Sequence, residues 1–254
     1  MTKLIVQIPC WNEEATIGYT ISQIPRHYPK VDLVEILVID DGSSDKTIPT
    51  ALNAGANHLL KLSSHRGLSA AFQAGVQEAL KLGADIIVNI DADNQYEASE
   101  IKNLIEPIIL KKADLVIGDR LASKLVFLSH WKRFLYFCAD LVVSILTGIH
   151  SPDPTSGFRA MTASFARGIN LRDKHSYTIE TLIQAYLSKK NVVFIPVDSR
   201  LVSRPSRLIK NTGIYILKSS FSLFRSLIVY RAKSPGIIVN LAPEVTHGNS
   251  ECLA

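Results

Sequence analysis

The stretch DIIVNIDADNQYE (residues 85–97) decides the fold, because a β-branched apolar run ends in two aspartates one residue apart. The run predicts a buried strand over 85–91. Two carboxylates this close are costly unless a positive charge lies between them. Alternate residues of an extended segment point the same way, so we expect Asp91 and Asp93 to converge on one divalent cation, with Gln95 as a neutral oxygen ligand. Hard oxygen ligands suit Mg²⁺ or Mn²⁺. A solvated surface turn would also explain the pair taken alone.

Further short apolar runs alternate with segments of helical periodicity through the first half of the chain. Strands are expected at 3–9, 35–40, 57–62 and 114–119, and helices near 13–25, 45–54, 67–82 and 97–112. This alternation predicts an α/β fold with a Rossmann-like, mostly parallel sheet and helices on both faces. Ligands of such sheets bind at the carboxyl ends of the strands.

The expected strand ends carry polar residues in four places, and most of these residues are acids. They are PCWNEE (9–14), DDGSSD (40–45), DADNQ (91–95) and GDR (118–120). One such end fits an ordinary helix cap: Asn12 is a candidate N-cap, and Ser44 or Asp45 another. Four ends on one edge outline a site. The chain has neither G-x-G-x-x-G nor a P-loop, so a nucleotide would be held in another way.

Composition places the chain among globular proteins, with 254 residues, 47% hydrophobic and 20% charged. Its net charge of +5 is unevenly distributed, because no acid lies between Asp198 and Glu244, where Lys and Arg are frequent. This region predicts an anionic partner or a membrane surface. Three scattered cysteines favour neither a disulfide framework nor a zinc site.

The second half is less regular. We expect a helix over 125–149, a loop at 151–160, a helix at 176–187, a strand at 191–197 and a helix over about 209–231. The apolar segment 134–149 has 16 residues, fewer than the roughly 20 that span a membrane. The last helix has an apolar stripe flanked by cations, which fits a helix lying on an anionic membrane or one packed on the sheet. The expected parts are a catalytic domain at 1–208, an amphipathic basic helix at 209–233 and a loose tail at 234–254.

Five motifs, in order, resemble those of family 2 glycosyltransferases of the GT-A fold. They are P-x-x-N-E (9–13), VIDDGSSDKT (38–47), RGLSAA (66–71), DADNQ (91–95) and SGFR (156–159), within about residues 3–210. The subgroup most similar in appearance is the polyprenyl-phosphate sugar transferases, of the dolichol-phosphate mannosyltransferase kind. The resemblance implies an inverting, metal-dependent enzyme that moves a sugar from a GDP- or UDP-linked donor to a polyprenyl-phosphate lipid. It also implies a peripheral protein at the cytoplasmic face of the membrane, on the lipid surface or on a membrane-protein partner.

The resemblance assigns roles to residues of this chain. It places Asp91, Asp93 and Gln95 at the metal, and Arg120 and Arg133 at the acceptor phosphate. It places a loop arginine over the donor diphosphate. That arginine is Arg204 in RPSR (204–207), although proline replaces the usual glycine and arginine the usual lysine, so Arg200 and Arg207 stay candidates. The residues implied for the rest of the donor site are Pro9, Trp11, Glu13, Ile39, Asp41, Arg66, Gly67 and Ala92.

Other functions stay open at this point. A hydroxyl acceptor on a glycolipid or saccharide would need a carboxylate base, for which Asp153 and Glu180 are the candidates. Arg120 and Arg133 favour a phosphate acceptor instead. A nucleotide-sugar-binding protein without turnover is a third possibility, against which the intact D-x-D argues. Nucleic-acid binding is disfavoured, because the basic region has no aromatic residues arranged for stacking on a strand face.

Overall fold

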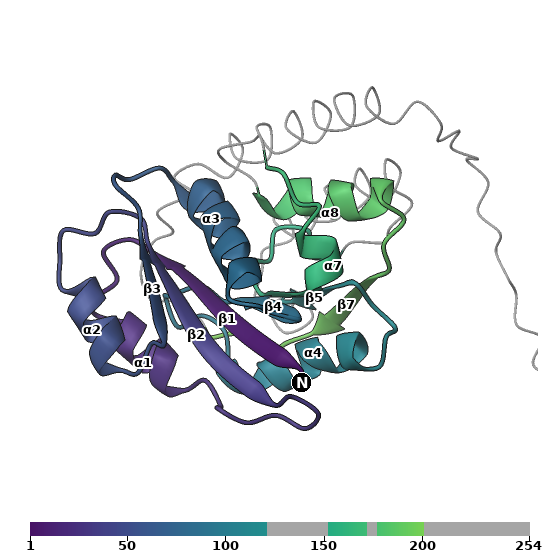
Figure 1. Ribbon diagram of the computed structural model, residues 1–254, viewed down its shortest axis with the longest axis horizontal. Coiled ribbons are helices and arrows are strands. Elements are labelled where there is room, and N and C mark those ends of the chain that lie inside the picture. Colours follow the sequence, from purple (N-terminus) through teal and green to yellow (C-terminus); the bar gives the residue numbers. More distant parts are fainter. Residues whose placement is uncertain (121–151, 172–176, 201–254) are drawn as a thin grey trace, which may run out of the picture.

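A seven-stranded sheet forms the centre of the computed structural model, which describes residues 1–120, 152–171 and 177–200 (Figure 1). The strand order is β3-β2-β1-β4-β6-β5-β7. β6 runs antiparallel to β4 and β5, and the other neighbouring pairs are parallel. The strands are β1 (Lys3–Cys10), β2 (Leu33–Asp40), β3 (His58–Lys61), β4 (Ile86–Asn89), β5 (Leu115–Asp119), β6 (Arg159–Thr162) and β7 (Val192–Pro196).

Helices cover both faces of this sheet, as the alternating pattern predicts. In Figure 1, α3, α7 and α8 lie on one face, and α1, α2 and α4 on the other. The helices are α1 (Ile17–Ser22), α2 (Thr47–Asn53), α3 (Leu68–Lys81), α4 (Ile101–Ile109), α7 (Ala163–Ala166) and α8 (Tyr177–Leu187), and the 3-10 turn η1 (Ala98–Glu100) precedes α4.

Two hydrophobic cores follow from the alternation of side chains along β1. Leu4, Val6 and Ile8 are completely buried in the core beneath α1, α2 and α4. Ile5 points to the opposite face and packs in the core beneath α3, α7 and α8. Because both faces are covered, the strands are apolar nearly throughout, and ligands are left with the carboxyl-terminal edge.

Three expected boundaries are corrected by the structure. The segment predicted as a loop at 151–160 ends in a strand, because β6 begins at Arg159. The first helix begins at Ile17 instead of near 13, after Asn12 adopts a positive φ of 53°. β4 ends at Asn89, so the aspartates that follow do not lie on an extended strand.

Several expectations concern residues outside the described ranges. These are the helix at 125–149, the basic helix at 209–233 and the tail at 234–254, together with Arg133, Arg204 and Arg207. Within the described ranges, every helix is too short or too polar to cross a lipid bilayer.

Candidate active site

Asp41, directly after β2, organises the loop that precedes α3. Its buried carboxylate accepts hydrogen bonds from the backbone N–H of Arg66 (2.7 Å) and of Gly67 (2.8 Å). Gly67 has a φ of +92°, which favours glycine. Gly42 has a φ of +80°, and a methyl group there would lie 2.9 Å from the backbone nitrogen of His65. The loops after β2 and β3 therefore pack backbone against backbone at the strand edge.

A stacked pair of rings lies beside this carboxylate. The rings of Trp11 and His65 are 4.2 Å apart between centroids, and His65 Nδ1 is 2.8 Å from Asp41 Oδ2. Trp11 keeps 38% of its surface exposed, which is unusual for so large an apolar side chain. His65 thus connects two residues predicted for the nucleoside pocket, Trp11 and Asp41. His65 was not among the residues predicted from the sequence, although its position directly before the RGLSAA motif could have indicated it.

The loop after β1 is tied to the loop after β2 by hydrogen bonds. Asn12 does not cap α1: its side-chain oxygen accepts from the Ser44 N–H (2.8 Å), and its own N–H donates to Ser43 Oγ (2.9 Å). Glu13 is buried, and its N–H donates to Thr47 Oγ1 (2.7 Å). Asp45 accepts from the Thr47 N–H at the start of α2 (3.0 Å), although Lys46 occupies the N-cap position itself.

Asp91 and Asp93 lie in a turn, so the expected extended geometry is wrong. The N–H of Gln95 donates to Asp93 Oδ1 (3.1 Å), and Asn94 has a φ of 58°. The two carboxylates are nevertheless near enough to interact. Burial raises the pKa of Asp91, and the charge of Asp93 raises it further. Ala92, between them, is buried in the core, and its carbonyl accepts from Thr20 Oγ1 (3.2 Å).

The oxygens of Asp91, Asp93 and Gln95 are of the kind that a hard divalent cation prefers. Among the residues that the structure describes, no group of three or more His, Cys, Asp or Glu side chains is placed to hold a metal. Two carboxylates and the amide oxygen of Gln95 suit Mg²⁺ or Mn²⁺, which commonly takes one or two carboxylates and completes its shell with water and substrate phosphates. The mutual repulsion of Asp91 and Asp93 is what such an ion would relieve.

Gly157, of the SGFR motif, lies directly against Asp91. A methyl group at this position would be 2.8 Å from Asp91 Oδ2 and 2.8 Å from the Tyr177 hydroxyl oxygen, closer than side-chain carbons approach. The Gly157 carbonyl accepts from Asn89 Nδ2 (2.8 Å), and its N–H donates to the Tyr96 hydroxyl (3.2 Å). Glycine is therefore required here by the closeness of backbone and carboxylate.

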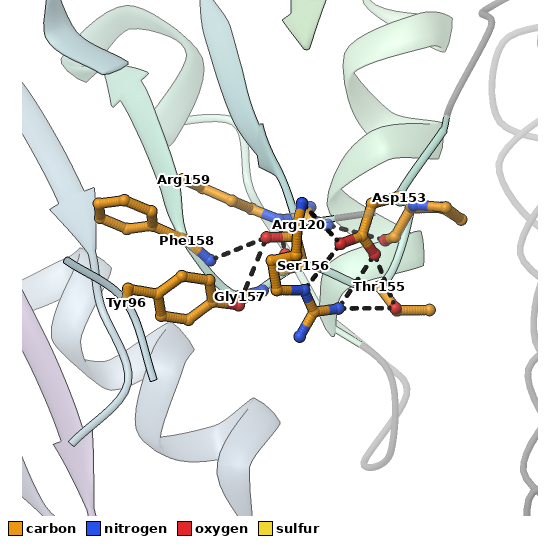
Figure 2. Close-up of polar contacts among 9 residues, drawn as sticks. Tyr96, Arg120, Asp153, Thr155, Ser156, Gly157, Phe158 and Arg159 are labelled. Carbon is orange, nitrogen blue, oxygen red and sulfur yellow. Dashed lines mark hydrogen bonds and ion pairs between the residues drawn. The ribbon is translucent and has the colours of Figure 1, made fainter. Parts of the chain in front are cut away.

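Arg120 and Asp153, predicted separately as phosphate ligand and base, form one ion pair (Figure 2). Arg120 Nε donates to Asp153 Oδ2 (2.7 Å) and Nη2 donates to Oδ1 (3.0 Å) and to Thr155 Oγ1 (3.1 Å). Asp153 is completely buried, whereas Arg120 is 18% exposed. Burial acts to raise the pKa of Asp153, but the charge and hydrogen bonds of Arg120 outweigh it and hold this pKa below its ordinary value.

Glu180, the second candidate base, is 1% exposed within α8. The same stretch of α8 contacts Arg159, whose completely buried guanidinium reaches both α8 and the loop at 153–157. Burial lowers the pKa of Arg159 to about 10, so it stays charged at neutral pH. The sequence singled out the SGFR motif, but it gave this arginine no role.

Arg200, an alternative to Arg204 as the diphosphate arginine, is engaged elsewhere. Its Nη2 donates to Glu97 Oε2 (2.7 Å), its Nη1 donates to Asn94 Oδ1 (2.9 Å), and its backbone N–H donates to the Gln95 carbonyl (2.8 Å). It therefore braces the turn that carries the proposed metal ligands. Of the candidates for the loop arginine, Arg204 and Arg207 lie outside the described residues.

Two residues predicted for the donor pocket are buried beneath it. Ile39 is completely buried, and a methyl group on Gly75 of α3 would lie 2.7 Å from Ile39 Cδ1. Its side chain belongs to the core and does not line the pocket, because the alternation along β2 turns it towards α3. Pro9 is likewise buried in β1.

Comparison with known proteins gives a consistent assignment. Residues 5–169 match the family described as Glycosyl transferase family 2. The undecaprenyl-phosphate mannosyltransferase of Micrococcus luteus is 27% identical over 205 residues, 77% of this chain and 82% of that protein. The UDP-N-acetylglucosamine–dolichyl-phosphate N-acetylglucosaminyltransferase of Methanococcus voltae is 26% identical over 245 residues, 88% of this chain and 94% of that protein.

A solved structure shares the fold. Glucosyl-3-phosphoglycerate synthase of Mycobacterium tuberculosis, crystallised with Mn²⁺, UDP and glucosyl-3-phosphoglycerate, superposes with a TM-score of 0.64. The match covers 90% of this chain and 79% of that one, at 20% identity, and it extends the likeness in fold beyond the family match.

Proposed function

The chain belongs to glycosyl transferase family 2, and from this premise we propose that it transfers a sugar from a nucleotide-sugar donor to the phosphate of a polyprenyl-phosphate lipid. A phosphate oxygen attacks the anomeric carbon from the face opposite the leaving group. The bond from that carbon to the donor's β-phosphate oxygen breaks, and the nucleoside diphosphate leaves with the electron pair. One displacement of this kind inverts the anomeric configuration.

The surroundings of the two candidate bases, Asp153 and Glu180, favour a phosphate acceptor over a hydroxyl acceptor. A hydroxyl acceptor needs a carboxylate that can take its proton. Both oxygens of Asp153 already accept hydrogen bonds from Arg120, and a lowered pKa makes this carboxylate a poor base. Glu180 is buried in α8. A phosphate monoester carries a charge of about −1.5 to −2 at pH 7, so it needs no base.

The proposal divides the binding work between the two sides of the site. Arg120 and Arg133 hold the acceptor phosphate, and the exposed face of Trp11 stacks on the nucleobase beside Asp41. Asp91, Asp93 and Gln95 hold Mg²⁺ or Mn²⁺, which neutralises the charge that develops on the departing diphosphate. Arg204 adds hydrogen bonds to that diphosphate.

The names of the two relatives support this acceptor, since both denote transfer to a polyprenyl-type phosphate. The glucosyl-3-phosphoglycerate synthase that binds UDP and Mn²⁺ supports a metal-assisted donor site on the same fold. We place the reaction at the cytoplasmic face of a membrane, where the basic region after Asp198 meets an anionic surface.

A comparison of two acceptors that differ only in the phosphate tests the proposal. The protein is incubated with Mn²⁺ and a panel of UDP- and GDP-sugars, together with either a short polyprenyl phosphate or the corresponding polyprenol. We expect nucleoside diphosphate to be released, and glycolipid to form, with the phosphate alone. Equal release with polyprenol would establish a hydroxyl acceptor and overturn the phosphate assignment. Tight binding of a nucleotide sugar without release to any acceptor would favour a binding protein.

A further inference from the structure

Arg159 is a charged residue that the proposed chemistry leaves without a role, although it is completely buried. Its guanidinium donates four hydrogen bonds, all to neutral oxygens. Nε donates to the Ser156 carbonyl (2.7 Å) and Nη2 to the Pro154 carbonyl (2.9 Å). On the other side, Nη1 donates to the Thr178 carbonyl (2.6 Å) and to Thr181 Oγ1 (2.6 Å).

This arrangement is costly for a role in stability alone. Across the described ranges, no carboxylate lies within ion-pair distance of the Arg159 guanidinium. A buried charge without such a partner pays a large desolvation penalty, and apolar residues of similar volume commonly stabilise a core at least as well. The planar guanidinium of Arg159, unlike an apolar side chain, can bond the loop at 153–157 and α8 at the same time.

Each of these segments carries a residue of the proposed site. The loop at 153–157 begins with Asp153, which holds Arg120, and ends with Gly157, which lies against Asp91. The N-terminal part of α8 contributes Tyr177, whose hydroxyl lies beside the same glycine. The Arg159 guanidinium is also 6.0 Å from the centre of the Tyr177 ring.

We propose that Arg159 is a positioning residue, which fixes the loop at 153–157 to α8 and so sets Arg120 at the acceptor in register with Asp91 at the metal. Arg159 touches neither substrate. Arg159 bonds the Pro154 and Ser156 carbonyls of this loop. These bonds keep Asp153 in contact with Arg120 and Gly157 in contact with Asp91. The distance between the acceptor phosphate and the donor then depends on this one guanidinium.

The inference rests on the proposed function, and Arg159→Lys tests it. Lysine keeps the charge, but its single ammonium cannot bond both segments in the geometry of the fork. Arg26→Lys is the matched control: this exposed arginine bonds the Gly55 carbonyl and Asn57 far from the site. We measure kcat and the KM for polyprenyl phosphate, Mn²⁺–UDP affinity by calorimetry, and thermal unfolding.

We expect Arg159→Lys to raise the acceptor KM and to lower kcat, each about tenfold, because small displacements of reacting groups have effects of this size. Mn²⁺–UDP affinity should change less than threefold. A lower unfolding temperature with kcat and KM like those of Arg26→Lys would show a merely structural role and overturn the proposal. Should Arg159→Lys fail to fold, Thr181→Val removes one of the four acceptors, and unchanged kinetics in that variant would overturn it equally.

Failure of the proposed function would look different. Wild-type protein that uses another acceptor, but not polyprenyl phosphate, would refute the phosphate assignment. The same comparison of KM and kcat, made with that acceptor, would then decide the role of Arg159.

Discussion

The proposed donor and acceptor sides of the site balance charge in opposite ways. On the donor side, the acids after β1 and β2 are held largely by backbone N–H groups and hydroxyls, as Asp41 is by Arg66 and Gly67. On the acceptor side, the buried carboxylate of Asp153 is held by the guanidinium of Arg120, and Arg159 adds a completely buried cation. The donor side therefore keeps its negative charge, whereas the acceptor side is supplied with positive charge by the chain itself.

This difference assigns a separate source of compensation to each substrate. A donor diphosphate entering among Asp41, Asp91 and Asp93 would be repelled unless it brings a cation. An acceptor phosphate would meet Arg120, which Asp153 already holds in place. We therefore expect donor binding to require the metal ion. We expect acceptor binding to require the buried contacts that hold Arg120 in position. Variants on each side of the site test these two expectations.

Asp93→Ala should have the largest effect, because it removes the carboxylate on which the donor side depends. We expect kcat to fall by at least about 10²-fold, since the departing diphosphate loses its metal-borne compensation. Labelled glycolipid formation measures turnover, and circular dichroism verifies folding. Asp32→Ala, at an exposed carboxylate, is the control. Activity near that of the control at any Mn²⁺ concentration would refute the metal assignment.

Gly157→Ala should follow, because the added methyl group would collide with the carboxylate of Asp91. Asp91 must turn away, so we expect Mn²⁺–UDP affinity and turnover each to fall about tenfold or more. The control is Gly168→Ala, where the new methyl group would lie an ordinary 3.5 Å from the Phe165 carbonyl. Calorimetry provides the affinity. An alanine variant that binds Mn²⁺–UDP like wild type would show that Asp91 is not a ligand.

Asp153→Asn tests the acceptor side alone. Without its charged partner, the fork of Arg120 loses its orientation, so we expect the acceptor KM to rise about tenfold while donor affinity stays unchanged. Steady-state kinetics over pH 6 to 9 separates this role from that of a base. A base would give a large loss of kcat and a changed pH profile at an unchanged KM, and that result would restore the hydroxyl acceptor.

The same variant carries a pH signature in stability. The pKa of Asp153 is lowered on folding, so its ion pair stabilises the protein above the ordinary value of 3.8 and this contribution is lost as pH falls through the folded-state pKa. We expect wild type to unfold at a higher temperature than Asp153→Asn at pH 6, with the difference shrinking below pH 4. A constant difference across that range would contradict the pairing.

Most of the fold could be predicted because it follows from local pattern. Short, continuous apolar runs and segments of helical periodicity predicted the strands and helices of the first half within a few residues. β6 was missed because it is a four-residue strand, RAMT, whose first residue is arginine. A charged residue at a buried strand position contradicts the pattern, and its hydrogen bonds to the loop at 153–157 and to α8 explain it.

The candidate site residues could be predicted where a single motif contains them. Contacts between residues of two distant motifs could not be predicted. DADNQ supplied three candidate oxygen ligands from five consecutive residues. The pairing of Arg120 with Asp153 joins residues 33 positions apart, and nothing in either motif indicates that one neutralises the other. Glu97, which binds Arg200 from 103 positions away, is of the same kind.

The smallest effect is expected at the ring stack of the donor side. Trp11→Ala removes a face for the nucleobase, and His65→Ala removes only the ring behind it. We expect UDP affinity to fall up to about tenfold in the first variant and about twofold in the second, in line with the 0.5–1.5 kcal/mol of a stacking contact. Neither change should alter the acceptor KM, because the stack lies on the donor side. Calorimetric titration with UDP and Mn²⁺ measures both. A larger loss for His65→Ala than for Trp11→Ala would mean that the imidazole, through its contact with Asp41, holds the base pocket, and the donor side would then depend on a charge pair just as the acceptor side does.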